Sequence, residues 1–392
     1  MILVDRPYVS PHFTETARSG GIPVILTEYA KQLGFSTSED ALSEEDAIAQ
    51  IRSADIPKLY STSENAIGWI AENLSDTSLL HMIKSFKDKV VFRTITQELF
   101  PDLFFTAVPY ADLASFNISA VPMPCIIKPA VGFFSMGVHM VSSADQWPEV
   151  VEKINREIDS VSELYPNEVL DAGTFIIEQM IYGEEFAIDA YYDEQGLPVI
   201  VGIYAHMFAS EDDVRDRIYY TSKELIVEHL DEFTGFLRAI GDIAQVKNFP
   251  VHVELRRDRD GALLPIEVNP LRFGGWCTTA DLTALAYGFN PYLAYFHGEK
   301  PDWEQLLTGK DGLSYSIIVL DNSTGYEASQ IASFDYDALL SRFSHPLELR
   351  KIDYHVYPVF AFLFTRNDSR TMGELDHMLH SDLSEFIRLS SS

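Results

Sequence analysis

The first 80 residues alternate short apolar runs with amphipathic stretches. The runs "MILV" at 1–4 and "IPVIL" at 22–26 predict strands, and "SEEDAIAQI" at 43–51 predicts a helix with an acidic first turn. The stretch "IPKLYSTSENAIGWIAENL" at 56–74 predicts a strand, a turn and a second helix. Because strands that alternate with helices are typical of a parallel sheet, we expect a small parallel α/β domain here.

The pattern changes after residue 84. A helix is predicted at 85–99, a strand–glycine loop–strand at 124–143, a long charged helix at 145–164, several strands at 174–208 and a helix at 222–245. Beyond about residue 305, two more apolar runs predict strands and a final helix is expected near 371–388. The mixture of helices and antiparallel strands is α+β in character.

The stretch "VHVELRRDRDGALLPIEVN" at 251–269 predicts a hairpin. Asp260-Gly261 is a strong signal for a two-residue turn, because such turns need a positive φ. That turn would pair Glu254 with Glu267 and His252 with Asn269. Since strand side chains alternate between faces, all four would share one face.

Two carboxylates that face each other across a ladder repel, whereas a divalent cation between them makes their interaction favourable. Oxygen ligands from Glu254, Glu267 and Asn269 suit Mg²⁺, which completes its shell with water and substrate phosphate. The alternative is a solvated acidic face on an edge hairpin. His252 would either contact phosphate or be a hydrogen-bonded strand histidine.

Two other segments have polar groups at strand ends. In "IIKPAVGFFSMGV" the apolar strand ends at Lys128, and Gly132, Ser135 and Gly137 would let backbone N–H groups approach a phosphate. In "FIIEQMIYGEEFAIDAYY" Glu178 and Gln179 end one strand and Glu185 begins the next, as a nucleotide base and ribose would require. An ordinary hairpin loop and ordinary strand-end acids are the alternatives.

Composition narrows the class of protein. A chain of 392 residues is long enough for two or three domains. A formal charge of −30 would repel phosphate backbones and anionic lipid, so nucleic-acid and membrane partners are not expected. No apolar run reaches the roughly 18 residues that a membrane span needs. Two cysteines make no disulfide framework, and we expect a reducing, cytoplasmic location.

Taken together, these segments resemble the ATP-grasp superfamily of carboxylate–amine ligases. The resemblance covers about residues 84–275 and keeps the family's order of four blocks. These are "KDK" at 87–89, K-P-x-x-G-x-x-S-x-G-V at 128–138, E-x-x-I-x-G-x-E at 178–185, and an acid followed by E-x-N-P with an arginine and two glycines at 254–275.

The resemblance implies a domain organisation. Residues 1–83 would be the α/β domain that precedes the grasp, 84–177 the central subdomain with the glycine loop, and 178–304 the C-terminal subdomain with the metal site. Residues 305–392 would be an α+β extension that either completes the site or forms a homodimer.

The resemblance also implies ligands and roles. The cofactors would be ATP and two Mg²⁺ ions, for which Mn²⁺ could substitute. Nucleotide contacts would come from Lys89, Lys128, Gly132, Ser135, Gly137, Glu178, Gln179, Ile181 and Glu185. Glu254, Glu267 and Asn269 would bind the metal. Lys128 and Arg272 would be catalytic, with Arg272 near the acyl phosphate or the substrate carboxylate.

The activity implied is ATP-dependent joining of a small carboxylate, such as an amino acid, to an amine through an acyl phosphate. A kinase acting on a hydroxyl and a nucleotide-binding protein without turnover are the alternatives. The segment 204–224 has mixed charge and three tyrosines, and is a candidate lid in which Arg215 or Arg217 contacts the second substrate. A solvated connection is the other interpretation of that segment.

Overall fold

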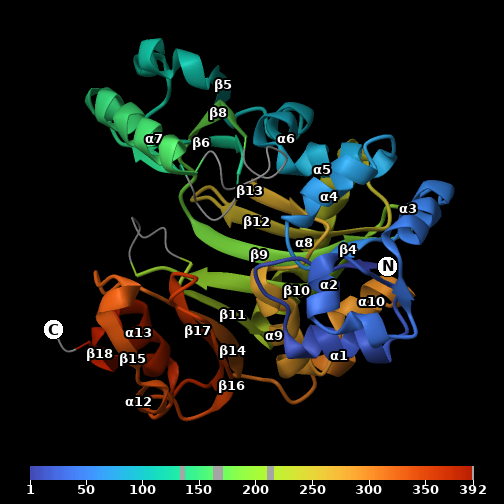
Figure 1. Cartoon of the computed structure of the whole chain (residues 1–392). Coiled ribbons are helices and arrows are strands. Elements are labelled where there is room, and N and C mark those ends of the chain that lie inside the picture. Colours follow the sequence, from blue (N-terminus) through green and yellow to red (C-terminus); the bar gives the residue numbers. More distant parts are fainter. Residues whose placement is uncertain (133–136, 162–170, 210–215, 391–392) are drawn as a thin grey trace. The chain divides into compact units, whose positions relative to one another are not determined.

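The structure is a computed structural model that describes residues 1–132, 137–161, 171–209 and 216–390 (Figure 1). The chain forms two compact units. Unit 1 comprises Met1–Gly183, Ala190–Val199 and Thr234–Trp276, and unit 2 comprises Glu184–Asp189, Ile200–Phe233 and Cys277–Ser392. Among the described residues, no helix is both long and apolar enough to cross a membrane.

The N-terminal part of unit 1 is a small parallel α/β layer. Strands β1 (Ile2–Leu3), β2 (Val24–Ile25), β3 (Ala41–Leu42) and β4 (Tyr60–Ser61) have the order β3-β2-β1-β4, and every pair is parallel. The connections include α1 (Pro11–Ser19), α2 (Glu28–Gln32), α3 (Glu44–Ser53) and α4 (Ala66–Asn73). The Ser43 side chain accepts from the Asp46 N–H and so caps α3. The predicted parallel α/β arrangement is confirmed.

The single helix predicted at 85–99 is wrong. The chain instead forms α5 (Ser78–Lys87) and α6 (Lys89–Ile95), separated by Asp88. Asp88 has extended backbone angles, and its carboxylate accepts hydrogen bonds from the N–H groups of Val90 and Val91. An aspartate in this conformation caps a new helix and stops continuation of the previous one.

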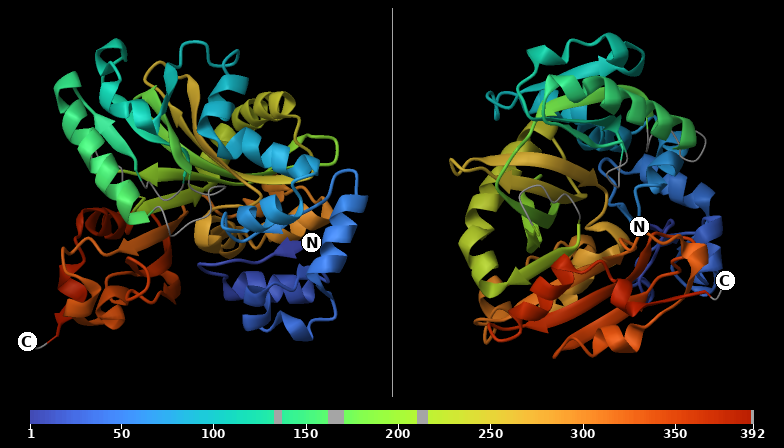
Figure 2. Two further views of the ribbon diagram at one scale, coloured as in Figure 1. Left: turned by 45° about the horizontal axis from the view of Figure 1, so that its top comes forward. Right: turned by 90° about the vertical axis from the view of Figure 1, so that its left-hand side faces the viewer.

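A second sheet in unit 1 carries the glycine loop. Strands β5 (Phe105–Pro109), β6 (Cys125–Val131), β7 (His139–Val141) and β8 (Asp171–Gln179) form an antiparallel sheet of order β5-β8-β6-β7. Helix α7 (Trp147–Val161) covers one face of this sheet (Figures 1 and 2), where Trp147, Val150 and Ile154 pack on buried strand residues. The two strands predicted within 124–143 are confirmed, and residues 133–136 of the loop between them lie outside the described residues.

A larger antiparallel sheet has the strand order β13-β12-β9-β10-β11-β14-β17-β16. Its members are β9 (Glu184–Tyr192), β10 (Pro198–Met207), β11 (Ile218–Ser222), β12 (Phe249–Arg257), β13 (Leu263–Pro270), β14 (Ser314–Asp321), β16 (Pro346–Lys351) and β17 (Val359–Asn367). The helix predicted at 222–245 is α8 (Lys223–Ala244).

The C-terminal part of unit 2 has its own apolar core. Beyond β13 the helices are α9 (Thr278–Tyr287), α10 (Pro291–His297), α11 (Trp303–Leu306), α12 (Tyr336–Leu340) and α13 (Met372–His380), and β15 (Ile331–Phe334) pairs with β18 (Ile387–Leu389). Ile318 and Phe360 from the sheet pack in one cluster with Leu375 and Met378 of α13. The final helix predicted near 371–388 therefore ends at His380, and a short strand follows it.

Candidate functional site

The hairpin β12–β13 places the predicted acidic face as expected, although its turn differs. Glu254 lies opposite Glu267, and His252 lies opposite Asn269. The predicted two-residue turn is wrong, because the strands end with the pair Arg257–Leu263 and a five-residue connection follows. A bulge between Glu254 and Leu255 shifts the register by one residue and restores the predicted pairs.

The two faces of this hairpin are chemically distinct. Val251, Val253 and Leu255 are at most 1% exposed, so their face belongs to the core. On the opposite face Glu254 and Glu267 keep side-chain exposures of 28% and 21%. The carboxylates are thus held by a buried strand pair yet remain partly open to solvent.

Lysines from the α5–α6 junction lie beside this face. The ammonium of Lys89 is 3.3 Å from Glu267 Oε1, and both Lys87 and Lys89 donate to the carbonyl oxygen of Gly132, at 2.8 and 3.4 Å. Burial alone would raise the pKa of the Glu267 carboxyl, but Lys89 and Lys87 outweigh it and lower that pKa. The described end of the glycine loop, the lysines and an acid of the hairpin therefore meet in one place.

Arg272 is held by an acid from the N-terminal layer. Glu64 pairs with both Arg272 and Lys87, and the Nε of Arg272 donates to its Oε1 at 3.1 Å. Burial would raise the pKa of Glu64, but the two cations lower it to about 2. The guanidinium also donates to the Phe273 carbonyl at 2.9 Å, which fixes its plane. Arg272 is thus oriented before any ligand binds.

Lys128 belongs to a second buried ion cluster. Its ammonium lies 2.5 Å from Glu178 Oε1, and the Nε of Arg93 donates to the other carboxylate oxygen at 2.9 Å. All three side chains are at most 8% exposed. Burial opposes ionisation of Glu178, but Arg93 and Lys128 prevail and lower its pKa to about 2.

We expect this carboxylate to make stability depend on pH in acid. Because the folded pKa of Glu178 is depressed from 4.5 to about 2, its contribution is present above pH 4.5 and is lost as the pH falls toward 2. The shift corresponds to roughly 3 kcal/mol of unfolding free energy. Urea unfolding of the wild type and of Glu178→Gln between pH 6 and 2 measures the difference.

Glu72→Gln is the matched control, since Glu72 is exposed on α4. The Glu178→Gln variant should be less stable at pH 6 and lose less stability on acidification, whereas Glu72→Gln should follow the wild type. Parallel pH profiles for all three proteins would contradict the role of the Glu178 cluster.

The segment from Glu178 to Gly183 is fixed by its backbone. Gln179 exchanges hydrogen bonds with Phe104, both at 3.1 Å, and Arg256 donates to the Ile181 carbonyl at 2.5 Å. Gly183 has φ of 136°, and a Cβ there would lie 1.9 Å from the Arg257 carbonyl oxygen, so only glycine fits. The geometry explains the glycine in this motif by close packing alone.

Two predicted residues, Ser135 and Arg215, lie outside the described residues. Gly137 lies inside them with φ of 68°, a conformation that favours glycine. Arg217 is fully buried in unit 2, where its Nε lies 2.8 Å from Asp321 Oδ1 and it donates to Ser323 at 2.8 Å. This packing favours a structural role for Arg217 over the predicted contact with a substrate. Glu185 also belongs to unit 2 and is described below.

Three residues of these clusters were missed by the sequence prediction: Glu64, Lys87 and Arg93. Arg93 follows Lys89 by four positions on one helix, so both fall on the same face, and this spacing was a usable signal. Lys87 stands within the "KDK" block itself. Glu64 is 208 positions from Arg272, and no local pattern in one sequence announces such a contact.

Comparisons with known proteins agree with these observations. Residues 121–280 match the family model described as an ATP-grasp domain. A search of curated protein sequences finds no match.

Solved structures extend the likeness over the whole chain. An L-amino acid ligase from Bacillus licheniformis has a TM-score of 0.69 at 17% identity, with 100% of this chain and 98% of that chain covered. The biotin carboxylase domain of the Hydrogenobacter thermophilus 2-oxoglutarate carboxylase, in complex with MgADP, has a TM-score of 0.62 at 11% identity, with 99% and 90% covered.

A third solved structure is similar to the same extent. The N5-carboxyaminoimidazole ribonucleotide synthetase from Thermotoga maritima has a TM-score of 0.62 at 12% identity, with 100% of this chain and 99% of that chain covered. The resemblance predicted from the sequence motifs is confirmed. Residues 121–280 thus match an ATP-grasp domain, and the chain has the ATP-grasp fold.

Proposed function

We propose that the protein is an ATP-dependent ligase that joins a small carboxylate to an amine and releases ADP and phosphate. The observation that carries the proposal is the facing pair Glu254–Glu267 on a buried hairpin, with Lys89 3.3 Å from Glu267. Two facing carboxylates can bind a divalent cation, and a lysine beside them can contact the phosphate that is bound to this cation. The likeness to an L-amino acid ligase and a ribonucleotide synthetase supports the C–N ligase class.

The donor set fits magnesium. Glu254, Glu267 and Asn269 offer only oxygen ligands from one strand-pair face, and hard oxygen ligands are those that Mg²⁺ prefers. When bound, the ions would neutralise charge on the phosphates during transfer. We propose that these three residues hold the ions and that Mn²⁺ can replace them.

We propose that nucleotide contacts come from the residues predicted by the motifs. Lys89 and Lys128 would hold the phosphates, the backbone of Gln179 and Ile181 the base, and Glu185 the ribose. Glu178 would lie near the amino group of the base, and its ion pairs would also fix Lys128 and Arg93. The loop from Gly132 to Gly137, including Ser135, would close over the phosphates.

The chain's own groups would then support amide formation. A carboxylate is a poor electrophile, and phosphorylation to an acyl phosphate replaces an oxide leaving group by phosphate. The amine attacks the carbonyl carbon, a C–N bond forms and the C–O bond to phosphate breaks. The guanidinium of Arg272 would stabilise the oxyanion, and its fixed orientation lowers the cost of doing so.

The domain organisation of 1–83, 84–177, 178–304 and 305–392 is part of the same proposal, as is a cytoplasmic location. Both cysteines are buried and free, which fits a reducing compartment. The expected partners are a small carboxylate and a small amine, with the C-terminal extension forming a homodimer or completing the site.

A phosphate-release screen over pairs of amino acids and other small acids and amines tests the function. We expect phosphate release only when a particular acid and amine are both present with Mg-ATP, and mass spectrometry should detect the amide. Release of ADP with a phosphorylated product would indicate a kinase instead. ATP binding without consumption in any mixture would refute enzymatic turnover on these substrate classes.

A further inference from the structure

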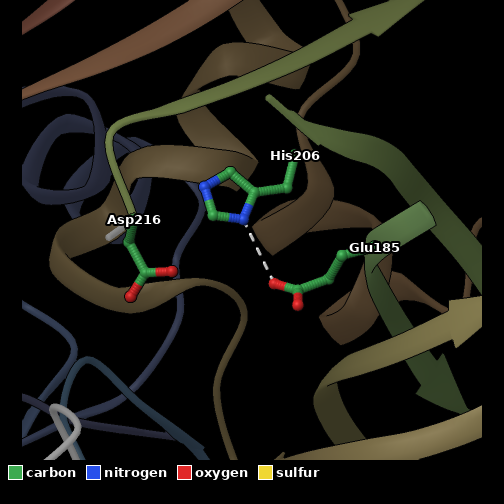
Figure 3. A group of neighbouring side chains, drawn as sticks. All are labelled: Glu185, His206 and Asp216. Atoms are coloured by element: carbon green, nitrogen blue, oxygen red, sulfur yellow. Dashed lines mark hydrogen bonds and ion pairs between the residues drawn. The ribbon is translucent and has the colours of Figure 1, made fainter. Parts of the chain in front are cut away.

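Unit 2 contains a group of metal-ligating side chains that the proposed catalytic chemistry does not use as a metal site. Glu185, His206 and Asp216 each direct one ligand atom into a space where these atoms lie within 4.8 Å of one another (Figure 3). The carboxylate of Glu185 lies 3.2 Å from His206 Nδ1. We propose that these three residues form a binding site for a borderline divalent cation such as Zn²⁺.

The topology brings the three ligands to one end of adjacent strands. Glu185 stands near the start of β9, His206 near the end of β10, and Asp216 just before β11 begins at Ile218. Because β9, β10 and β11 are neighbours in the sheet, these ends lie together. A cation here would hold the start of β9 against the end of β10 and the start of β11.

The imidazole adds a buried nitrogen ligand to the two acids. The His206 side chain is 1% exposed, and its Nδ1 is the ring nitrogen that faces Glu185, at 3.2 Å. Figure 3 shows both carboxylates below the ring, with Glu185 joined to Nδ1 and Asp216 across the same space. Nδ1 would therefore bind the cation, with the ring proton on Nε2.

Outer contacts hold the ligands in place. The Tyr219 hydroxyl donates to Asp216 Oδ1 at 2.8 Å, and the Tyr219 ring stacks on the His206 ring with centroids 4.3 Å apart. The stacking follows from the ladder, in which His206 pairs with Tyr219. Hydrogen-bonded carboxylates and oriented imidazoles are features that tune real metal sites.

The donor set selects the type of cation. One imidazole and two carboxylates suit Zn²⁺ or Co²⁺ better than Mg²⁺, which favours oxygen alone. Tetrahedral bonds of about 2.0–2.1 Å would separate ligand atoms by roughly 3.4 Å, so exposed Asp216 needs to move inward only slightly. Three protein ligands leave a fourth position for water.

The cation and the nucleotide would compete for Glu185, which is also the residue proposed above for the ribose. The test is therefore made on the full chain without nucleotide, in millimolar Mg²⁺ that occupies the all-oxygen site. A negative result for Zn²⁺ binding would leave the ligase proposal intact. A negative result in the ligase screen would likewise leave the Zn²⁺ proposal intact.

Calorimetric titration with zinc chloride is the experiment, supported by the visible absorption of the Co²⁺ form. We expect one Zn²⁺ per wild-type chain, no comparable binding to His206→Gln, and at least tenfold weaker binding to Asp216→Asn. Tyr219→Phe keeps the ring but loses the hydroxyl, and should weaken binding by about tenfold. His355→Gln removes an exposed histidine beside a tyrosine in the same unit and should bind like the wild type.

Thermal melting with and without Zn²⁺ gives a second readout, since a ligand bound only to the folded state raises the melting temperature. If the buried His206 variant does not fold, Asp216→Asn and Tyr219→Phe decide, because Asp216 is exposed and Tyr219→Phe preserves the ring. No stoichiometric binding to the wild type overturns the proposal. Equal affinity in Asp216→Asn and Tyr219→Phe, or the same loss in His355→Gln, also overturns it.

Discussion

Replacement of Glu267 by glutamine should reduce product formation by at least about 100-fold, because it removes one anionic ligand from the proposed magnesium pair. Glu267 faces Glu254 across the ladder, so each carboxylate is poorly placed without a cation. Lys89 partly offsets the repulsion at 3.3 Å. The measurements are steady-state phosphate release with the substrates found by the screen, and Mg-ATP binding by calorimetry.

The same substitution should leave the fold nearly unchanged. Loss of the like-charge pair stabilises the strand, whereas loss of the Lys89 contact destabilises it; Glu267 is partly exposed and Lys89 keeps the Gly132 carbonyl, so we expect the two effects largely to offset each other. The variant should therefore melt close to the metal-free wild type yet gain little from Mg-ATP. Asp260→Asn, at the exposed tip of the same hairpin, is the control and should behave as wild type. A Glu267→Gln enzyme with wild-type turnover would remove this residue from the metal site.

Periodicity predicted most elements of this fold because the strands and helices have regular apolar positions. Its failures were local. Asp88 splits the predicted helix at 85–99 by capping its second half, and a capping aspartate between two lysines looks like a solvent-facing helical residue in sequence. The hairpin turn was placed by Asp260-Gly261, whereas Asp258 accepts from Asp260 and Ala262 and widens the connection.

The sequence predicted those residues of the candidate site that belong to the four motif blocks. The pairing of Glu254 with Glu267 was predicted from a turn at Asp260-Gly261 that the structure does not have, and the bulge that restores the pairing cannot be recognised in a single sequence. The clusters around Glu64 and Glu178 depend on contacts between residues 23 to 208 positions apart. Such contacts arise from tertiary packing, and neither composition nor local spacing encodes which acid each buried cation will find.

In the two buried clusters, the cationic side chains are held in place by acids of the protein. Glu64 joins Arg272 to Lys87, Lys87 and Lys89 share the Gly132 carbonyl, and Lys89 reaches Glu267. The cationic residues are thus already fixed by acids and a carbonyl, and little side-chain freedom remains to be lost on ligand binding. Buried pairs of this kind contribute little net stability but are costly to break singly, so substitutions must be chosen to separate folding from chemistry.

Arg272→Ala should abolish amide formation while ATP still binds. Loss of a group that stabilises an oxyanion costs about 100- to 1,000-fold in turnover. Arg272→Lys keeps the charge but loses the two-pronged contact with Glu64 and the donation to the Phe273 carbonyl, so it should recover only part of the activity. Amide yield by mass spectrometry and ATP affinity by calorimetry distinguish loss of chemistry from loss of binding.

Glu64→Gln tests whether the acid positions Arg272 or merely supports the fold. The amide keeps the shape but releases both cations, so we expect a less stable protein and a fall in turnover with nearly unchanged KM for ATP. A structural role alone would lower stability without lowering turnover of the folded fraction. Because Glu64 anchors the guanidinium that would meet the oxyanion, the double variant Glu64→Gln/Arg272→Ala should be no slower than Arg272→Ala. A wild-type amide yield from Arg272→Ala, or additive losses in the double variant, would reject this arrangement.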